Sequence, residues 1–276
     1  MFLGLKAMLF AMLLPLLPVS GFGAEAAQPL PSADTLMQRV LNRSEARAKA
    51  TNAPVWTYNK RAVMEKLDGD GKVKERNEKF YRVRMVQGVP IATLVKVEGR
   101  VLNQAELEKE SQSEAAFQKK VSGRDPKKTV AKREALIFTN LSERFRFTTL
   151  RREDFQGRQT VVVSFEAKPG KGNGGIPDQI LDRITGTLWV DEATADVARL
   201  EARLTKELSL GPFGVLGTMK ACQFELVSKP MPDGIWLPEK SLMSISARFF
   251  LSSMRFRMEE TSDGFALEPE PKAGRQ

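Results

Sequence analysis

The sequence predicts a mainly β protein (α+β), built on one strongly curved antiparallel sheet, or unclosed β-barrel, of about ten strands covered by a few helices. From residue 55 onward, apolar and polar residues alternate with a period of two, which is typical of strands with one buried face. The alternating segments are joined by hairpin-length turns rich in Gly, Asp and Pro. Such short connections indicate an antiparallel meander, because parallel strands need long crossovers.

Residues 1–26 have the organisation of a secretory signal peptide. Lys6 supplies the positive charge, residues 7–19 are apolar, and residues 24–26 (Ala-Glu-Ala) place small residues where signal peptidase reads the chain. The apolar stretch is shorter than the roughly 20 residues that a membrane-spanning helix needs, and two prolines interrupt it. The sequence therefore predicts cleavage after Ala26 and export to the periplasm.

After the signal, a single domain is expected over residues 27–266, followed by a disordered tail over 267–276. A charged helical insertion interrupts the strand pattern at about 102–144. This insertion begins with Asn103, which can cap a helix while Glu106 closes a capping box.

The segment before the first strand is expected to be an amphipathic helix. Its apolar side chains, including Leu36 and Val40, recur at helical spacing on one face, and Ser32 or Asp34 is the expected N-cap. We expect the apolar face of this helix to cover the mouth of the sheet.

Composition limits the chemistry that the chain can perform. It contains no histidine, which excludes Ser-His-Asp and Cys-His nucleophilic sites and histidine metal sites. Cys222 is the one cysteine, so no internal disulfide can form. A carboxylate enzyme remains an alternative, but Glu153–Asp154 and Asp191–Glu192 both fall in predicted turns, where charged residues are common. The sequence therefore predicts no enzyme, no metal and no cofactor.

Two glycine-bearing stretches resemble binding loops without their essential residues. Residues 68–71 (Asp-Gly-Asp-Gly) start like a calcium loop, but Lys72 and Lys79 stand where that loop requires oxygen ligands. Residues 171–175 (Lys-Gly-Asn-Gly-Gly) lack the Gly-Lys-Ser/Thr ending of a phosphate loop. We interpret the first as a hairpin turn and the second as part of a flexible loop over 168–177.

Three segments and their order carry a resemblance to a known family. Behind the first helix, a Trp-x-Tyr strand leads into the Asp-Gly hairpin; later come residues 155–165 (FQGRQTVVVSF), 184–192 (ITGTLWVDE) and 233–239 (DGIWLPE). This order resembles the periplasmic lipoprotein-sorting carriers of the LolA/LolB type, and especially their uncharacterised outer-membrane lipoprotein-sorting relatives. The resemblance implies an unclosed, bent sheet with an apolar concave face under helices. It also implies non-covalent uptake of acyl chains.

The resemblance implies lipid or lipoprotein acyl chains as partners, transient membrane contact and a role in outer-membrane biogenesis. The chain lacks the lipidated cysteine of an anchored receptor, which favours a soluble carrier. The alternative is an envelope sensor or structural module that docks a partner protein and has a filled core. The net charge of +9 fits anionic envelope surfaces rather than nucleic acid, although it is equally that of a solvated surface.

The expected ligand-binding residues are apolar or aromatic side chains that the helical spacing or the strand alternation assigns to one inner face. Adaptable methionines beside large aromatic rings suit an acyl ligand, whereas a dry core is the alternative interpretation. These residues are Leu36, Val40, Trp56, Tyr58, Met64, Leu188, Leu200, Phe224, Met243 and Phe256.

Overall fold

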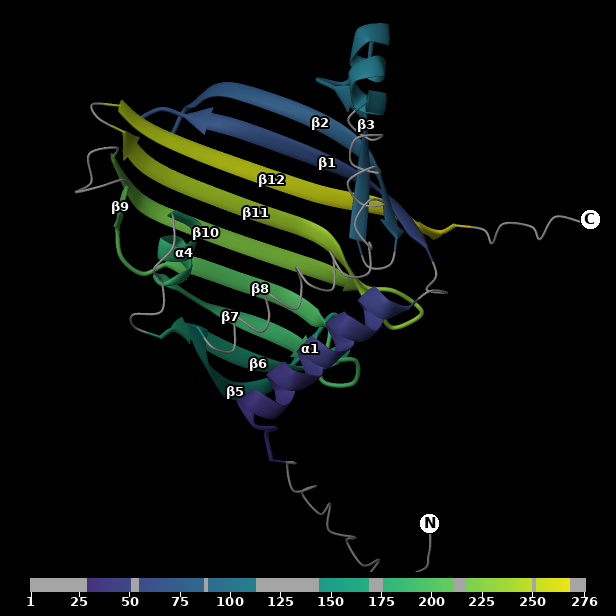
Figure 1. Ribbon diagram of the computed structural model, residues 1–276, viewed down its shortest axis with the longest axis vertical. Helices are drawn as coiled ribbons and strands as arrows, with labels where there is room; N and C mark the ends of the chain where they lie inside the picture. Colours follow the sequence, from purple (N-terminus) through teal and green to yellow (C-terminus); the bar gives the residue numbers. More distant parts are fainter. Residues whose placement is uncertain are drawn as a thin grey trace, which may run out of the picture.

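All strands of the described chain belong to one antiparallel sheet (Figure 1). The computed structural model describes residues 29–50, 55–86, 89–112, 144–168, 176–210, 217–249 and 252–268. The predicted signal peptide and most of the predicted insertion lie outside these residues. The sheet has 12 strands and does not close on itself, which confirms the predicted fold class with more strands than the expected number of about ten.

The strands are β1 (Trp56–Leu67), β2 (Val73–Val86), β3 (Val89–Val97), β4 (Arg100–Val101), β5 (Phe145–Phe155), β6 (Arg158–Ala167), β7 (Ile184–Asp191), β8 (Val197–Leu204), β9 (Leu208–Leu210), β10 (Gly217–Pro230), β11 (Trp236–Phe249) and β12 (Ser252–Leu267). Helix α1 spans Ala33–Lys49, α4 spans Ile176–Leu181, and residues 104–112 are also helical. Among the residues that the structure describes, no helix is long and apolar enough to span a membrane.

The strand order is β4-β3-β2-β1-β12-β11-β10-β8-β7-β6-β5, and β9 pairs with β10. Most neighbouring strands of the sheet are also close together in the chain. The exception is the pair formed by the first long strand, β1, and the last strand, β12. β1 pairs with β12, from Trp56 opposite Leu267 to Leu67 opposite Arg255. We call this pairing the seam. It joins the meander β1–β4 to the strands β5–β12.

The turns and helix starts form where the sequence predicts them. The Asp68 carboxylate accepts the backbone N–H groups of Asp70 and Lys72, each at 2.9 Å, and so closes the β1–β2 hairpin. Asn103 Oδ1 accepts the N–H of Glu106 at 2.9 Å, and Glu106 Oε2 accepts the N–H of Asn103 at 2.9 Å. This reciprocal pair confirms the predicted capping box.

Helix α1 begins after Ser32, whose Oγ accepts the N–H of Thr35 at 3.2 Å. Ser32 rather than Asp34 is therefore the N-cap.

Two other boundaries differ from expectation. α4 begins inside the loop expected over 168–177, since a proline is tolerated in the first turn of a helix. β12 extends through Leu267, so the sheet includes the first residue of the expected tail, and residues 269–276 lie outside the described chain.

The main core lies between α1 and β5–β8. Helix α1 crosses one end of the sheet (Figure 1) and buries Leu36, Met37 and Val40, each at most 5% exposed. These side chains belong to one cluster with Val163 and Leu188 of the sheet. We call the sheet face that carries α1 the inner face.

Cross-strand register extends the inner face to the seam. Residues directly opposite one another in a ladder point to the same face of a sheet. One row of such residues crosses from β7 to β1 through Leu188, Leu200, Leu226, Ser241, Glu260 and Ala62.

The sheet curves around this face. β3 and β10 are five inter-strand steps apart, which would separate them by about 24 Å in a flat sheet. Pro90 and Ala92 of β3 nevertheless line the same hollow of about 280 Å³ as Phe224 and Leu226 of β10. The inner face is therefore concave, as the sequence predicts.

The outer face of the seam is charged. Arg257 pairs with Glu65, Arg76 pairs with both Glu65 and Glu78, and Arg61 pairs with Glu78. This network links β12, β1 and β2 on the side that faces water. The inner face of the seam differs from the outer face, because apolar side chains such as Met64 and Met258 lie there beside the ion pair of Lys60 with Glu260.

Candidate functional site: an apolar trough on the inner face

A row of apolar side chains crosses the seam on the inner face. Met64 of β1 lies opposite Met258 of β12, which lies opposite Met243 of β11, which lies opposite Phe224 of β10. Met64 is 50% exposed and the other three side chains are partly buried. We call these four residues the methionine row. It lies beyond the core that α1 covers.

A second apolar row runs beside the first. Phe256 of β12 lies opposite Ile245 of β11, which lies opposite Cys222 of β10, and all three side chains are partly buried. Burial raises the pKa of the Cys222 thiol, so it stays protonated as a small apolar group. The two rows together form an apolar surface that we call the trough.

At its other side, the methionine row borders the hollow of about 280 Å³. Phe224 and Met258 belong to both, so trough and hollow are continuous. The remaining apolar walls come from Val83, Pro90, Ala92, Leu226 and Pro238.

The hollow also contains a polar cluster. Lys60 Nζ lies 2.9 Å from Glu260 Oε1 and 5.2 Å from the centroid of the Tyr81 ring. Ser241 Oγ donates to Glu260 Oε2 at 3.3 Å. Tyr58 is 3% exposed, and its hydroxyl contacts Met85 Sδ at 3.9 Å. Burial, followed by the Glu260 charge, raises the pKa of Tyr58 to about 12, so the phenol remains a hydrogen-bond donor.

The structure divides the ten predicted ligand-binding residues into separate groups. Leu36, Val40 and Leu188 are at most 9% exposed and belong to the closed core, against which Leu200 packs. Trp56 belongs to a different buried cluster with Met231 and Leu237, and Tyr58 lines the hollow. The four that share the trough are Met64, Phe224, Met243 and Phe256.

Sequence reasoning missed the polar cluster. Lys60 follows the same inward alternation as Tyr58, and this was the available signal. Its partner Glu260 is 200 residues away, so local periodicity could not identify the pair.

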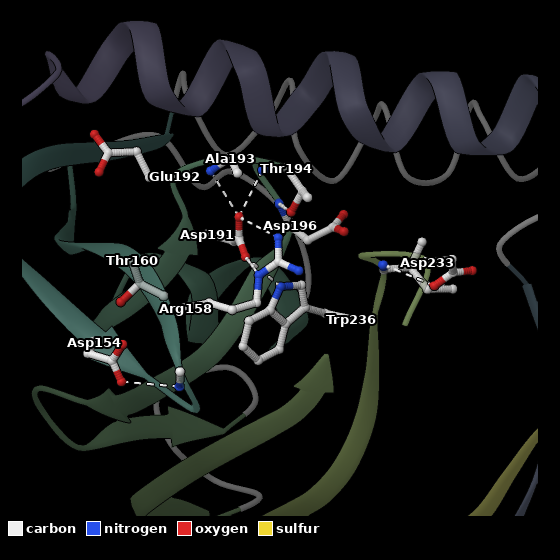
Figure 2. Close-up of polar contacts among 12 residues, drawn as sticks. Asp154, Arg158, Thr160, Asp191, Glu192, Ala193, Thr194, Asp196, Asp233 and Trp236 are labelled. Atoms are coloured by element: carbon white, nitrogen blue, oxygen red, sulfur yellow. Dashed lines mark hydrogen bonds and ion pairs between the residues drawn. The ribbon is translucent and has the colours of Figure 1, made fainter. Parts of the chain in front are cut away.

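Helix α1 is fixed to the turn between β7 and β8 by three arginines. Arg39 donates to the carbonyl oxygen of Glu192 at 2.7 Å. Arg43 and Arg47 both bind Asp196 Oδ1, at 3.3 and 2.9 Å, and Asp196 is 5% exposed. Figure 2 shows α1 lying above this turn. These contacts hold the helix in place over its filled core.

Asp191 begins the same turn and is 1% exposed (Figure 2). One of its oxygens accepts the backbone N–H groups of Ala193 and Thr194, at 2.9 and 2.8 Å. The other accepts the Trp236 indole N–H at 2.9 Å and contacts Arg158 Nε at 2.5 Å. Asp191, Arg158 and Trp236 come from the three segments that carry the family resemblance. The three segments therefore meet in a structural junction around Asp191.

The contacts of the Asp191 carboxylate predict that the folded protein loses stability in acid. Burial alone would raise the pKa of Asp191, but the Thr194 N–H, the Trp236 indole and the Arg158 guanidinium hold the pKa below its usual value. The folded pKa is thus below the unfolded one, so this stabilisation is present above about pH 4 and is lost as the pH falls through the folded pKa. Melting temperatures measured from pH 7 to pH 2 should fall below pH 4 less steeply in Asp191→Asn than in the unchanged protein. If the melting temperatures of the two proteins fall equally steeply below pH 4, this role of Asp191 is wrong.

Comparison with known proteins finds similarity at the level of structure. No protein-family profile matches the sequence, and neither does any curated protein. The fold aligns with a domain described as an outer membrane lipoprotein-sorting protein from Vibrio parahaemolyticus, with 10% identity, a TM-score of 0.32, and 87% of this chain and 95% of that chain covered. It also aligns with a LolA superfamily protein from Nitrosomonas europaea, with 9% identity, a TM-score of 0.29, and coverages of 88% and 96%.

A further alignment is to the MucA/MucB complex of Pseudomonas aeruginosa, with 12% identity, a TM-score of 0.24, and 85% of this chain and 99% of that chain covered.

Proposed function

We propose that this protein is a non-enzymatic binding protein of the bacterial envelope that holds the acyl chain of a lipid or lipoprotein in its trough. The methionine row is the observation that carries this proposal. It places three thioether side chains and one phenyl ring side by side on a concave surface. Flexible, polarisable methionines adapt to a chain that has no fixed shape of its own.

The contrast between the faces of the seam supports the proposal. On the outer face the strands carry an ion-pair network, whereas the same strands carry Met and Phe on the inner face. Partly exposed apolar side chains gathered on a concave face are typical of ligand grooves. Location in the periplasm rests on the signal peptide that the sequence predicts, and intact-mass measurement of the periplasmic form tests cleavage after Ala26.

A second candidate function is docking of an envelope protein partner. The core beneath α1 favours it, because Leu36, Val40 and Leu188 are packed there in one buried cluster. Mass spectrometry of lipids extracted from protein purified without detergent separates the two candidates. Bound acyl lipid supports the carrier, and lipid-free protein supports the docking module.

Changing Met243 to Asp should weaken the binding of an acyl chain by at least about tenfold, because a carboxylate in the trough would have to be desolvated beside the chain. Binding can be followed without an added label. Cys222 is the one thiol of the chain and lies in the trough, so saturating dodecanoate should slow its alkylation by a maleimide.

Ser244→Asp is the matched control, since Ser244 is the next residue on β11 and lies opposite Arg257 on the outer face. Its Cys222 should be protected by dodecanoate as in the unchanged protein. If dodecanoate leaves the alkylation rate of the delipidated, unchanged protein unaltered, the carrier function is wrong.

A further inference from the structure

We infer that Lys60, Glu260 and Tyr58 form a subsite for the oxygen-bearing head of an acyl chain whose hydrocarbon part lies along the methionine row. This inference rests on the proposed function and adds the chemistry of the ligand's polar end. It concerns the part of the hollow where Lys60 meets Glu260; Glu239, Lys240 and Ser262 also line the hollow.

Lys60 and Tyr58 bring hydrogen-bond donors to the hollow. An ammonium group carries three N–H donors, and in the described chain Lys60 uses one on Glu260 and presents its charge to the Tyr81 ring. Each Glu260 oxygen accepts one hydrogen bond, one from Lys60 and the other from Ser241. Tyr58 adds a hydroxyl whose contact is the weak acceptor Met85 Sδ. A ligand oxygen placed here would accept from the Lys60 ammonium and the Tyr58 hydroxyl.

The position of the cluster suits an acyl head. Glu260 is two residues from Met258 along β12, and Lys60 is four residues from Met64 along β1, so the polar groups lie about 7–14 Å from the methionine row. A polar head at Lys60 therefore leaves the first carbons of a chain beside the row. Phe224 and Met258 line the connection between them.

The low exposure of the Lys60 and Glu260 side chains makes the subsite selective for a head that carries oxygen. The Lys60 and Glu260 side chains are 24% and 29% exposed, so a hydrocarbon end placed against them would remove water from charged groups without replacing its hydrogen bonds. A cationic head would be repelled by the Lys60 ammonium. A carbonyl or carboxylate oxygen accepts directly from Lys60 and Tyr58. Ester-linked and free acyl chains share this oxygen, and the experiment below separates them.

The test measures displacement of N-phenylnaphthylamine, an apolar fluorophore without an acyl oxygen, from the delipidated full chain. The competitors are dodecanoate, methyl dodecanoate and dodecyltrimethylammonium, which share a chain and differ in the head. In Lys60→Gln, competition by dodecanoate should weaken about tenfold, while affinity for the fluorophore changes less than about twofold. Competition by dodecyltrimethylammonium should not weaken. Equal weakening of methyl dodecanoate identifies the ester carbonyl as sufficient, and weakening of dodecanoate alone identifies a free carboxylate.

Two further variants distinguish recognition from stability. Arg257→Gln removes an outer-face cation of β12 that pairs with a glutamate, Glu65, and should leave every competitor unchanged. Glu260→Gln removes the competing anion from Lys60 and should strengthen dodecanoate binding, which loss of structure cannot do. If Lys60→Gln alters dodecanoate binding no more than Arg257→Gln does, the subsite is wrong while the trough stands. If the unchanged protein does not bind the fluorophore, the proposed function and the subsite are both wrong.

Discussion

Changing Val40 to Asp is expected to lower the free energy of unfolding by about 3–5 kcal/mol, because an unpaired carboxylate would replace a buried side chain. Val40 is 4% exposed and belongs to the core cluster of α1, β6 and β7. The arginine contacts to Glu192 and Asp196 keep the helix from moving away to expose the new charge. Urea unfolding followed by circular dichroism measures the change.

Asn42→Asp is the matched control for this experiment. Asn42 lies on the exposed side of the same helix, and its side-chain oxygen accepts from Gln38, which aspartate can also do. Its effect should stay within about 0.5 kcal/mol. If Val40→Asp is tolerated as well as Asn42→Asp, α1 is a movable cover rather than part of a filled core.

Changing Asp191 to Ala is expected to cost a similar amount, about 3–5 kcal/mol, because it leaves a buried guanidinium contact and several N–H donors without their acceptor. The carboxylate is 1% exposed and binds Arg158, Trp236 and two backbone N–H groups at once. Calorimetric unfolding at pH 7 gives the difference directly. The near-ultraviolet circular dichroism of Trp236 should change as well, because its indole loses its partner.

Asp233→Ala provides the comparison, since Asp233 also accepts an indole N–H, that of Trp56, at 2.9 Å, but is exposed. Asp233→Ala should lower the free energy of unfolding by about 1 kcal/mol, the value of an ordinary hydrogen bond. If Asp191→Ala and Asp233→Ala lower the free energy of unfolding equally, Asp191 is not the centre of the junction.

Local features of the fold could be predicted from the sequence because they depend on residues close together in the chain. The Asp68 turn, the capping box of Asn103 with Glu106, and the inward face of Met64 each follow from spacing of a few residues. The seam could not be predicted, because no periodicity specifies which distant strand pairs with β1.

The candidate site could be predicted in part for the same reason. Alternation assigned Leu188 and Met243 to one face, and both lie there. Alternation does not state how far a helix reaches across that face, so it could not separate the filled core from the trough. Lys60 was missed because its role depends on Glu260, which is adjacent across the seam and distant in sequence.

The seam also has a consequence for the order in which the chain folds. Met64 belongs to the first long strand and its row partners Met258 and Met243 to the last two, so the ribosome has made nearly the whole chain before the row can assemble. Contacts between residues so far apart form late, because a long loop must close before any favourable contact compensates for it. A chain that leaves the cytoplasm unfolded would benefit from this delay. We expect the nascent protein to remain open, and thus able to be threaded across a membrane, until β12 emerges and pairs with β1.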